Sequence, residues 1–283
     1  KYIDILGLLR DKEFDIGKIS GSEIKAKITI GKSQKDSTRK QQKSFQSIFK
    51  ENFKKAKISS FSLEKINLTL FTLNDSTGPF FDIDSLRIDI SDILIDKQTL
   101  TRTIPVKFNE LKLVTGGLFY EASEFYNLST TEIALSIRDS SIQISNLKLM
   151  PRYSRQEYNR IKDYNSDLFN ISVPEISFSH FYFKEYVADG LIHFSSIDIQ
   201  EPDVEIYRDK TIPDAPFKYK PLLAGALRRI PKEILVDTIR VVGKRLQYEE
   251  KVHEPIPPGR VFFEPFYISA YHVTNHKPAI RRK

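Results

Sequence analysis

Apolar and polar residues alternate along most of the chain, and one arrangement of apolar residues recurs. Its form is apolar, x, apolar, four residues, apolar, x, apolar. Five copies are complete, and a sixth near the N-terminus is degenerate in its first position. The copies are Leu86, Ile88, Ile93 and Ile95; Leu111, Leu113, Leu118 and Tyr120; Leu135, Ile137, Ile142 and Ile144; Ile197, Ile199, Val204 and Ile206; Ile239, Val241, Leu246 and Tyr248; and, as the degenerate copy, Gly17, Ile19, Ile24 and Ala26.

Each half of the repeat has the period of two that is typical of a strand with one buried face. The step of five between the halves is odd, so a straight strand would place the two apolar pairs on opposite faces. A hairpin with a two-residue turn keeps both pairs on one face, and so does a bulge within one bent strand. The midpoints Thr115-Gly116, Asp139-Ser140, Glu201-Pro202 and Gly243-Lys244 are rich in turn formers and favour the hairpin, whereas Ile90-Ser91 fits it poorly.

Three insertions between the copies have helical patterns, at residues 44–56, 154–168 and 221–230. The second opens with a capping box formed by Ser154 and Glu157, and the third begins at Pro221. The remaining chain is predicted as strand or turn, with the heaviest aromatic strands at 178–186 and 262–271.

These elements predict a mainly β fold, a long curved antiparallel sheet that forms a groove or half-barrel with two or three short helices. We expect residues 1–283 to form one elongated segment of a larger protein. Its sub-regions are 1–57, with N-terminal strands and a basic helix; 58–153, with β repeats; and 154–283, with a helix and further β repeats.

Composition narrows the classes of protein. The chain has 13 Tyr and 20 Phe but no cysteine, which excludes disulfides, thiolate metal sites and cysteine nucleophiles. No apolar stretch reaches the roughly 18 residues of a membrane-spanning helix. Because the first residue is Lys1, we expect a processed form or an excised piece whose membrane anchor lies outside this chain.

The net charge of +7 is concentrated in residues 32–57, where nine Lys or Arg face Asp36 and Glu51. This concentration in one segment argues against a nucleic-acid-binding surface, so no nucleic-acid partner is expected. The segment predicts a helix with Phe45, Phe49 and Phe53 on one face and Lys50, Lys54 and Lys55 on the other. Such a helix can lie on anionic lipid or cover the open end of a sheet, and we favour the cap.

Signatures of catalysis are missing: the chain contains no phosphate-binding glycine loop and no nucleophile elbow. Of the histidines, His272 and His276 alone have metal-like spacing, but their context is strand-like. Five carboxylates, Asp82, Asp84, Asp89, Asp92 and Asp96, alternate with apolar residues and are predicted on the wet face of a strand. No enzyme activity, catalytic residue, metal or cofactor is therefore expected.

Six short segments of the sequence carry a family resemblance: 137–142, 146–151, 170–176, 197–210, 246–250 and 259–263. They resemble the AsmA-like family of Gram-negative envelope proteins, relatives of TamB and YhdP, in the form found in Bacteroidota. The resemblance covers roughly residues 57–275 and more weakly 1–30. It implies a curved sheet with an apolar interior that shelters or conducts lipid between membranes, or supports outer-membrane assembly, in the periplasm.

Three functions follow from these patterns. In the first, a phospholipid or another acyl-chain lipid lies against the apolar residues of the copies at 86–95, 111–120, 197–206 and 239–248. In the second, the chain is a structural or scaffolding module of the periplasm with a closed core and no ligand. The third, a glycan-active enzyme, requires two carboxylates about 5–9.5 Å apart in an aromatic cleft. The first is the preferred hypothesis.

Overall fold

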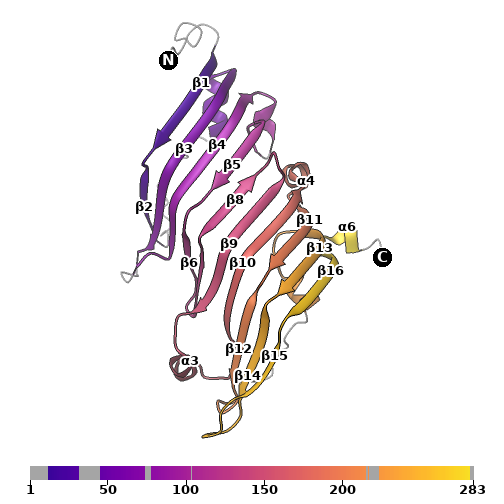
Figure 1. The fold of residues 1–283 in the computed structure, drawn as a ribbon. Coiled ribbons are helices and arrows are strands. Elements are labelled where there is room, and N and C mark those ends of the chain that lie inside the picture. The colour runs from indigo at the N-terminus through magenta and orange to yellow at the C-terminus, as the bar shows by residue number, and fades with distance from the viewer. Residues whose placement is uncertain are drawn as a thin grey trace. The chain divides into compact units, whose positions relative to one another are not determined.

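The computed structural model describes residues 12–31, 45–73, 78–102, 104–214, 216 and 223–280. The prediction of a mainly β fold with a curved sheet is confirmed, although the sheet is mixed because several neighbouring strands are parallel. The chain forms two compact units, and Figure 1 labels most of their helices and strands. Unit 1 comprises Lys1–Gly116 and Ala134–Ser140, and unit 2 comprises Gly117–Ile133 and Ser141–Lys283.

Unit 1 is built on two long strands, β3 and β4, that pair antiparallel. Strands β1 and β2 follow each other along the far edge of β3, both parallel to it. On the other side β4 pairs with β5, which in turn pairs with β8. The elements are β1 (Glu13–Ser22), β2 (Lys25–Ile30), α2 (Phe45–Asn52), β3 (Lys55–Thr72), β4 (Phe81–Asp96), the 3-10 helix η1 (Thr99–Thr101), β5 (Glu110–Val114) and β8 (Glu132–Ser136).

Unit 2 is centred on β10, which pairs antiparallel with β9 on one side and with β11 and β12 on the other. Strands β13 and β14 lie parallel to β11 and β12, and β16 and β15 follow antiparallel. The elements are β6 (Leu118–Ser123), β7 (Tyr126–Thr130), β9 (Ser141–Pro151), α3 (Arg155–Ile161), β10 (Leu168–Phe181), α4 (Phe183–Asp189), β11 (Ile192–Gln200), β12 (Asp203–Asp209), α5 (Leu223–Leu227), β13 (Ile234–Gly243), β14 (Arg245–Lys251), β15 (Gly259–Phe263), β16 (Phe266–Thr274) and α6 (Lys277–Ile280).

The hairpin interpretation of the repeat is wrong for most copies. The copy at 86–95 lies within the single strand β4. In the copy at 197–206, β11 and β12 run in one direction along the same edge of β10 and do not pair with each other. The copies at 239–248 and 17–26 likewise follow one edge of a neighbouring strand. A turn occurs in the copy at 135–144, where the Ser140 N–H donates to the Ile137 carbonyl at 3.2 Å.

The bends in these strands occur at residues with left-handed backbone angles. Eight of them, at φ values from 51 to 59°, belong to the strands or to the short connections between collinear strands: Glu23, Lys65, Ser85, Asp92, Asn146, Glu201, His180 and His272. One residue in this conformation shifts the alternation by one position, as a bulge does. Residues five apart on either side of it therefore keep the same face, which explains the odd step of the repeat.

The left-handed residues lie at the same level as residues of the neighbouring strands, and we call these alignments kink rows. In unit 1, kink row A contains the left-handed residues Glu23, Lys65 and Ser85, and kink row B contains the left-handed Asp92 with Gly17, Ser59 and Asn109 at its level. In unit 2, kink row A contains the left-handed Asn146 and Glu201 with Pro174 and Gly243, and kink row B contains the left-handed His180 and His272 with Ser195 and Asp237.

A glycine permits one close approach at kink row A of unit 1. The Gly116 N–H donates to the carbonyl oxygen of Asp84 at 2.8 Å. A Cβ atom at Gly116 would lie 2.6 Å from that oxygen, so any other residue would displace the backbone. Thr115-Gly116 therefore does not form a hairpin turn; it is the point at which the backbone at Gly116 packs closely against β4.

The helices lie at strand ends. Helix α2 packs Phe49 on Ala56 and Leu100 and is shorter than the predicted 44–56. Helix α3 begins at the predicted capping box. The Ser154 hydroxyl accepts a hydrogen bond from the Glu157 N–H, and the Glu157 carboxylate accepts one from the Ser154 N–H. Helix α5 lies inside the predicted 221–230, of which the structure describes 223 onward.

Helix α4 was not predicted. It replaces the second half of the expected strand 178–186, because β10 ends at Phe181, directly after the bend at His180. The helix ends at Gly190, whose φ of 73° suits glycine. Its aromatic residues pack back on β10, with the Tyr186 and Phe181 rings 5.9 Å apart.

Candidate functional site

One face of unit 2 carries apolar residues in rows that cross the strands. Directly opposite residues on neighbouring strands share a face, so the pairing register defines each row. On one side of kink row A the row is Tyr120, Leu128, Leu149, Ile171, Val204, Leu246 and Phe263. On the other side it is Ile144, Ile176, Ile199, Val241 and Ile268.

Unit 1 has the same arrangement. Its rows are Leu63, Ile88, Leu113 and Leu135; Ile19, Phe61, Ile90 and Leu111; and Ile16, Ile58 and Ile93. We call the surface formed by these rows in each unit its apolar face. The register thus places residues of the copies at 86–95, 111–120, 197–206 and 239–248 in such rows, and their binding of lipid stays a prediction.

Side-chain contacts show that the apolar face continues across the kink rows. In unit 2, Phe178 and Phe194 lie on either side of kink row B, yet their ring centroids are 5.1 Å apart. In unit 1, a Cβ atom at Gly21 would meet Leu63 Cδ2 at 3.0 Å and Ile24 Cδ1 at 3.7 Å, although kink row A separates Gly21 from Ile24. The bends therefore preserve one apolar side along each long strand.

The apolar face is only partly covered. Within the residues that the structure describes, the strands of each unit belong to one hydrogen-bonded sheet, so no second sheet of the same unit lies on this face. A few members of the rows, such as Ile93 and Ile176, are buried, while Ile268 and Phe263 are exposed by 49 and 60 %. Most of the other members are half-buried.

Helix α2 covers one end of the apolar face of unit 1. Phe49 is buried, and Phe53 packs on it and on Phe14, with ring centroids 5.5 and 4.5 Å apart. Lys50 is exposed on the helix, as expected for a cap. The predicted lysine face is shorter than expected, because Lys54 follows the helix and Lys55 begins β3. The side chain of Phe45 lies outside the described residues.

The opposite face of unit 1 is polar, and the aspartates of β4 lie there. Ser62 donates to Asp89 at 2.7 Å, Thr69 donates to Asp82 at 2.7 Å, and Asn67 donates to Asp84 at 2.6 Å, all across β3 and β4. The last of the run, Asp96, accepts the backbone N–H groups of Gln98 and Thr99 at the start of η1. Among the residues described, no group of three or more His, Asp or Glu is arranged to hold a metal.

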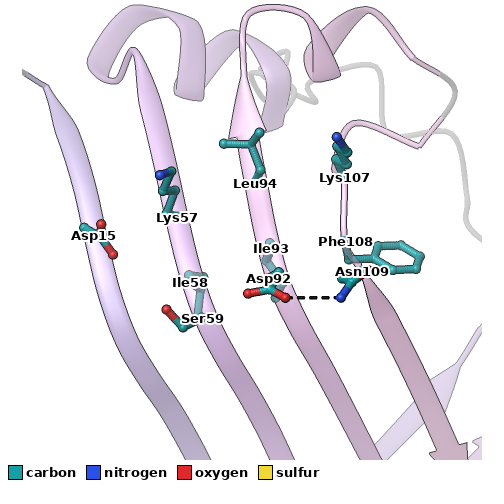
Figure 2. A pocket seen from close by; sticks show the side chains of 10 residues that line it. All are labelled: Asp15, Lys57, Ile58, Ser59, Asp92, Ile93, Leu94, Lys107, Phe108 and Asn109. Carbon is teal, nitrogen blue, oxygen red and sulfur yellow. Dashed lines mark hydrogen bonds between the residues drawn. The ribbon is translucent and has the colours of Figure 1, made fainter. Parts of the chain in front are cut away.

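Kink row B of unit 1 forms a hollow of about 490 Å³. Figure 2 shows it between β1, β3, β4 and the segment that leads into β5. The Asn109 amide donates to Asp92 at 3.4 Å, and Lys57, Lys107 and Asp15 supply the other charges. The two acidic and two basic groups balance one another, so the hollow favours neither anions nor cations. Its full lining is Asp15, Lys57, Ile58, Ser59, Asp92, Ile93, Leu94, Lys107, Phe108 and Asn109.

Sequence reasoning missed a buried ionic network beneath α3 in unit 2. Glu249, whose side chain is 5 % exposed, accepts hydrogen bonds from Arg155 at 2.7 Å and Gln247 at 2.7 Å, and Arg260 lies 2.9 Å away. Asn159 of α3 donates to the buried Asp209 at 2.6 Å. This network fixes α3 on the sheet beside a hollow of about 200 Å³. Its signal in the sequence was the alternation of polar residues in 245–251, which resembles any solvated face.

Tyr248 connects the apolar face to a charged group. It lies opposite Ile206 and Val261 in a second apolar row, and its hydroxyl donates to Glu250 at 2.7 Å. Burial, together with that hydrogen bond, raises the pKa of Tyr248 to about 12. The hydrogen bond from Tyr248, joined by Lys210 at 2.9 Å, lowers the pKa of Glu250.

The two histidines with metal-like spacing lie in different surroundings. His272 lies exposed at kink row B within β16. His276 precedes α6, and its Nδ1 lies 2.7 Å from Glu233. A third histidine, His193, lies between Glu185 at 2.8 Å and Asp237 at 3.5 Å and stacks on Tyr182. These contacts tie loops and α4 to the sheet.

Comparison with protein-family models, with curated proteins and with solved structures found no match. In the part of the chain that the structure describes, no helix is long and apolar enough to span a membrane.

Proposed function

We propose that this chain is a non-enzymatic, AsmA-like envelope protein whose apolar face shelters or conducts the acyl chains of phospholipid in the periplasm. The observation that carries the proposal is the continuity of the apolar rows across both kink rows, on a face that stays partly open. The proposal includes membrane association through a segment outside this chain and no nucleic-acid partner.

The chemistry of the face suits acyl chains. Its central rows consist mainly of Ile, Leu and Val, with Phe and Tyr at the ends, and their side chains offer acyl chains a surface without charge. Fully burying one such side chain stabilises by about 1.5–3 kcal/mol. A row of half-exposed aliphatic side chains therefore gains substantially when an acyl chain lies along it.

The bends themselves support a role for the face. A left-handed residue other than glycine costs roughly 1–2 kcal/mol, and the two units contain eight such residues in or between collinear strands. Without the bends, the far part of each strand would turn its apolar residues to the other side. The sequence retains this strain, and the result is one uninterrupted apolar side in each unit.

The alternative, a scaffolding module with a closed core, requires a layer that covers the apolar face. The described residues supply such a layer at the strand ends, through α2 and η1 in unit 1, whereas most members of the middle rows are half-buried and a few, such as Ile176, are buried. This observation favours a lipid ligand over a closed core.

The test measures phospholipid directly. Native mass spectrometry of gently purified protein should detect bound phospholipid, and delipidated protein should take up a fluorescent phospholipid from vesicles. The absence of both signals would contradict the proposal.

Two neighbouring phenylalanines provide a matched pair of variants. Phe263 lies in the apolar row opposite Leu246, and Phe262 lies on the other face opposite Gln247, with exposed fractions of 60 and 59 %. Because a lysine on the apolar face must be desolvated by an acyl chain, Phe263→Lys should weaken uptake at least about threefold. Phe262→Lys should leave uptake near the wild-type value. Equal uptake by the two variants would place the lipid elsewhere.

A further inference from the structure

One end of unit 1 carries an excess of basic side chains. At this end β1 and β3 begin and β4 finishes, because Glu13 lies opposite Lys55 and Lys55 lies opposite Asp96. Helix α2 leads into β3 there, and the segment after η1 returns to the sheet at Lys107. Up to the level of Lys57, the described residues contain four acids, Glu13, Asp15, Glu51 and Asp96, and eight bases, which we call the basic end: Lys12, Lys50, Lys54, Lys55, Lys57, Lys97, Arg102 and Lys107.

The charges of the basic end are not neutralised by ion pairs. All of its members except Lys55 are exposed, and none forms an ion pair with another described residue. Elsewhere in unit 1, ion pairs join Lys65 to Glu23 at 3.6 Å and Arg87 to Asp89 at 2.7 Å. The basic end therefore presents uncompensated positive charge to its surroundings.

The opposite end of unit 1 is balanced in charge. Around β2, the end of β3 and the start of β4, the described residues contain four bases and four acids: Lys25, Lys27, Lys65 and Arg87, with Glu23, Glu64, Asp82 and Asp84. The positive charge of the unit is thus concentrated at one end. Such an asymmetry directs that end toward a negatively charged surface during diffusional encounter.

The aromatic residues at the basic end pack against the sheet and not toward solvent. Phe49 is buried, and Phe14 and Phe53 pack in the same cluster. No exposed aromatic ring accompanies the basic end among the described side chains, although single-stranded nucleic acids are bound by stacking on such rings. Seven of the eight bases are lysines, which act as compact point charges and lack the arginine fork for individual phosphates. This chemistry favours a surface of many anionic groups, such as a bilayer.

We propose that the basic end docks on the surface of an anionic phospholipid bilayer, with its ammonium groups among the headgroup phosphates. Each Lys or Arg close to such a surface strengthens binding about fivefold. The apolar face of unit 1 reaches the same end, because Ile58 follows Ala56 on one side of β3 and Phe49 of α2 packs on Ala56. Docking thus brings the apolar face toward the lipid that it is proposed to receive, and in this respect alone the inference rests on the proposed function.

Flotation with lipid vesicles tests the docking. At about 0.1 M salt, the protein should float with vesicles of phosphatidylcholine that contain about 30 % phosphatidylglycerol and should not float with vesicles of phosphatidylcholine alone. Raising the salt to about 0.5 M should release it, because salt screens exposed charges. The variant Lys54→Glu with Lys97→Glu should bind the anionic vesicles at least about twentyfold more weakly, since it loses two attractive charges and gains two repulsive ones.

The matched control is Lys25→Glu with Lys27→Glu, which changes the net charge equally at two exposed positions of β2, at the opposite end of unit 1. It should bind the anionic vesicles within about threefold of the wild type, and circular dichroism should show that both variants are folded.

Four results would overturn the inference: equal flotation with neutral and anionic vesicles, equal losses in the two variants, unchanged binding by Lys54→Glu with Lys97→Glu, or tighter binding of a DNA duplex than of anionic vesicles at the same salt. Flotation and phospholipid uptake are measured separately. A protein that takes up phospholipid but does not float with anionic vesicles would overturn the docking alone. One that floats without taking up phospholipid would overturn the proposed function alone.

Discussion

Glu23 and Lys65 lie side by side in unit 1, both with left-handed backbones, at φ values of 59 and 52°, and their charged groups are 3.6 Å apart. Both side chains are mostly exposed, so the ion pair itself contributes little to stability. These two residues matter through their backbones. Glu23 connects β1 to β2, Lys65 lies in the parallel strand β3, and each shifts by one residue the alternation of faces along its strand. The apolar residues beyond the bend thereby stay in register with each other.

The bends should be sensitive to β-branched residues. Glu201, with φ of 51°, joins β11 to β12, and its side chain is exposed. Glu201→Ile should lower the free energy of unfolding by about 1–2 kcal/mol, because a β-branched residue fits the left-handed region poorly. Glu201→Gly should equal or exceed the wild type in stability, since glycine adopts this conformation without strain. Urea denaturation measures both, and equal destabilisation by Gly and Ile would argue against backbone strain.

The network beneath α3 should be a strong local stabiliser. Glu249→Ala removes a buried carboxylate that Arg155, Arg260 and Gln247 contact. We expect a loss of about 2–4 kcal/mol in the free energy of unfolding, because the remaining buried polar groups lose their partner. The control is Arg138→Ala, which breaks an exposed pair with Glu110 at 3.7 Å and should cost less than about 1 kcal/mol. Similar losses in the two variants would contradict a special role for the network.

The contact of α2 with the sheet should depend on one aromatic ring. Phe49 is 6 % exposed and packs on Ala56 and Leu100. Phe49→Ala should lower the free energy of unfolding by about 3–5 kcal/mol and leave a cavity, whereas the exposed Lys50→Ala should be nearly neutral. Hydrogen exchange of the amides of α2 measures whether the helix detaches. Unchanged protection in Phe49→Ala would show that other residues hold the helix.

The hydroxyl of Tyr248 should make stability depend on pH in the alkaline range. Its pKa in the folded chain is about 12, above the value of about 10 for an unfolded chain. The unfolded state therefore loses this proton first, and the contribution of Tyr248 is complete below about pH 10 and is lost as pH rises toward 12. Tyr248→Phe should flatten the decline of the unfolding free energy over this window. Tyr267→Phe, at an exposed position, is the control and should keep the wild-type slope.

Local patterns in the sequence contained most of the strands. The alternation of apolar residues located β4 and the start of β9, and the capping box located α3, because both signals depend on residues close to each other in the chain. The sequence also indicated that the five-residue step between the two halves of the repeat is either a hairpin turn or a bulge within one bent strand. The preference for a hairpin failed because Glu201-Pro202 and Gly243-Lys244 suit a bend as well as they suit a turn, and only pairing with distant strands decides between them.

Only part of the candidate site could be predicted, because the apolar rows also depend on pairing between distant strands. The pairs of the repeat lie in rows across the strands, but the rows depend on register, which no single segment determines. The bends at His180 and His272 were not foreseen, since neither residue is a usual turn former. The parallel pairing of β11 with β13 also depends on contacts between segments about forty residues apart.

The kink rows determine which face of the sheet each residue points to. Deleting one residue at Pro174 in β10 would move every side chain from there to Leu168 to the other face of the sheet. A compensating insertion a few residues away would restore the original faces. Substitution tolerance along β10 should accordingly alternate in steps of two and change parity at Pro174 and again at His180. Any homologue that gains or loses a residue in one strand must do so in its neighbours at the same level, so length changes are expected to be shared across the sheet.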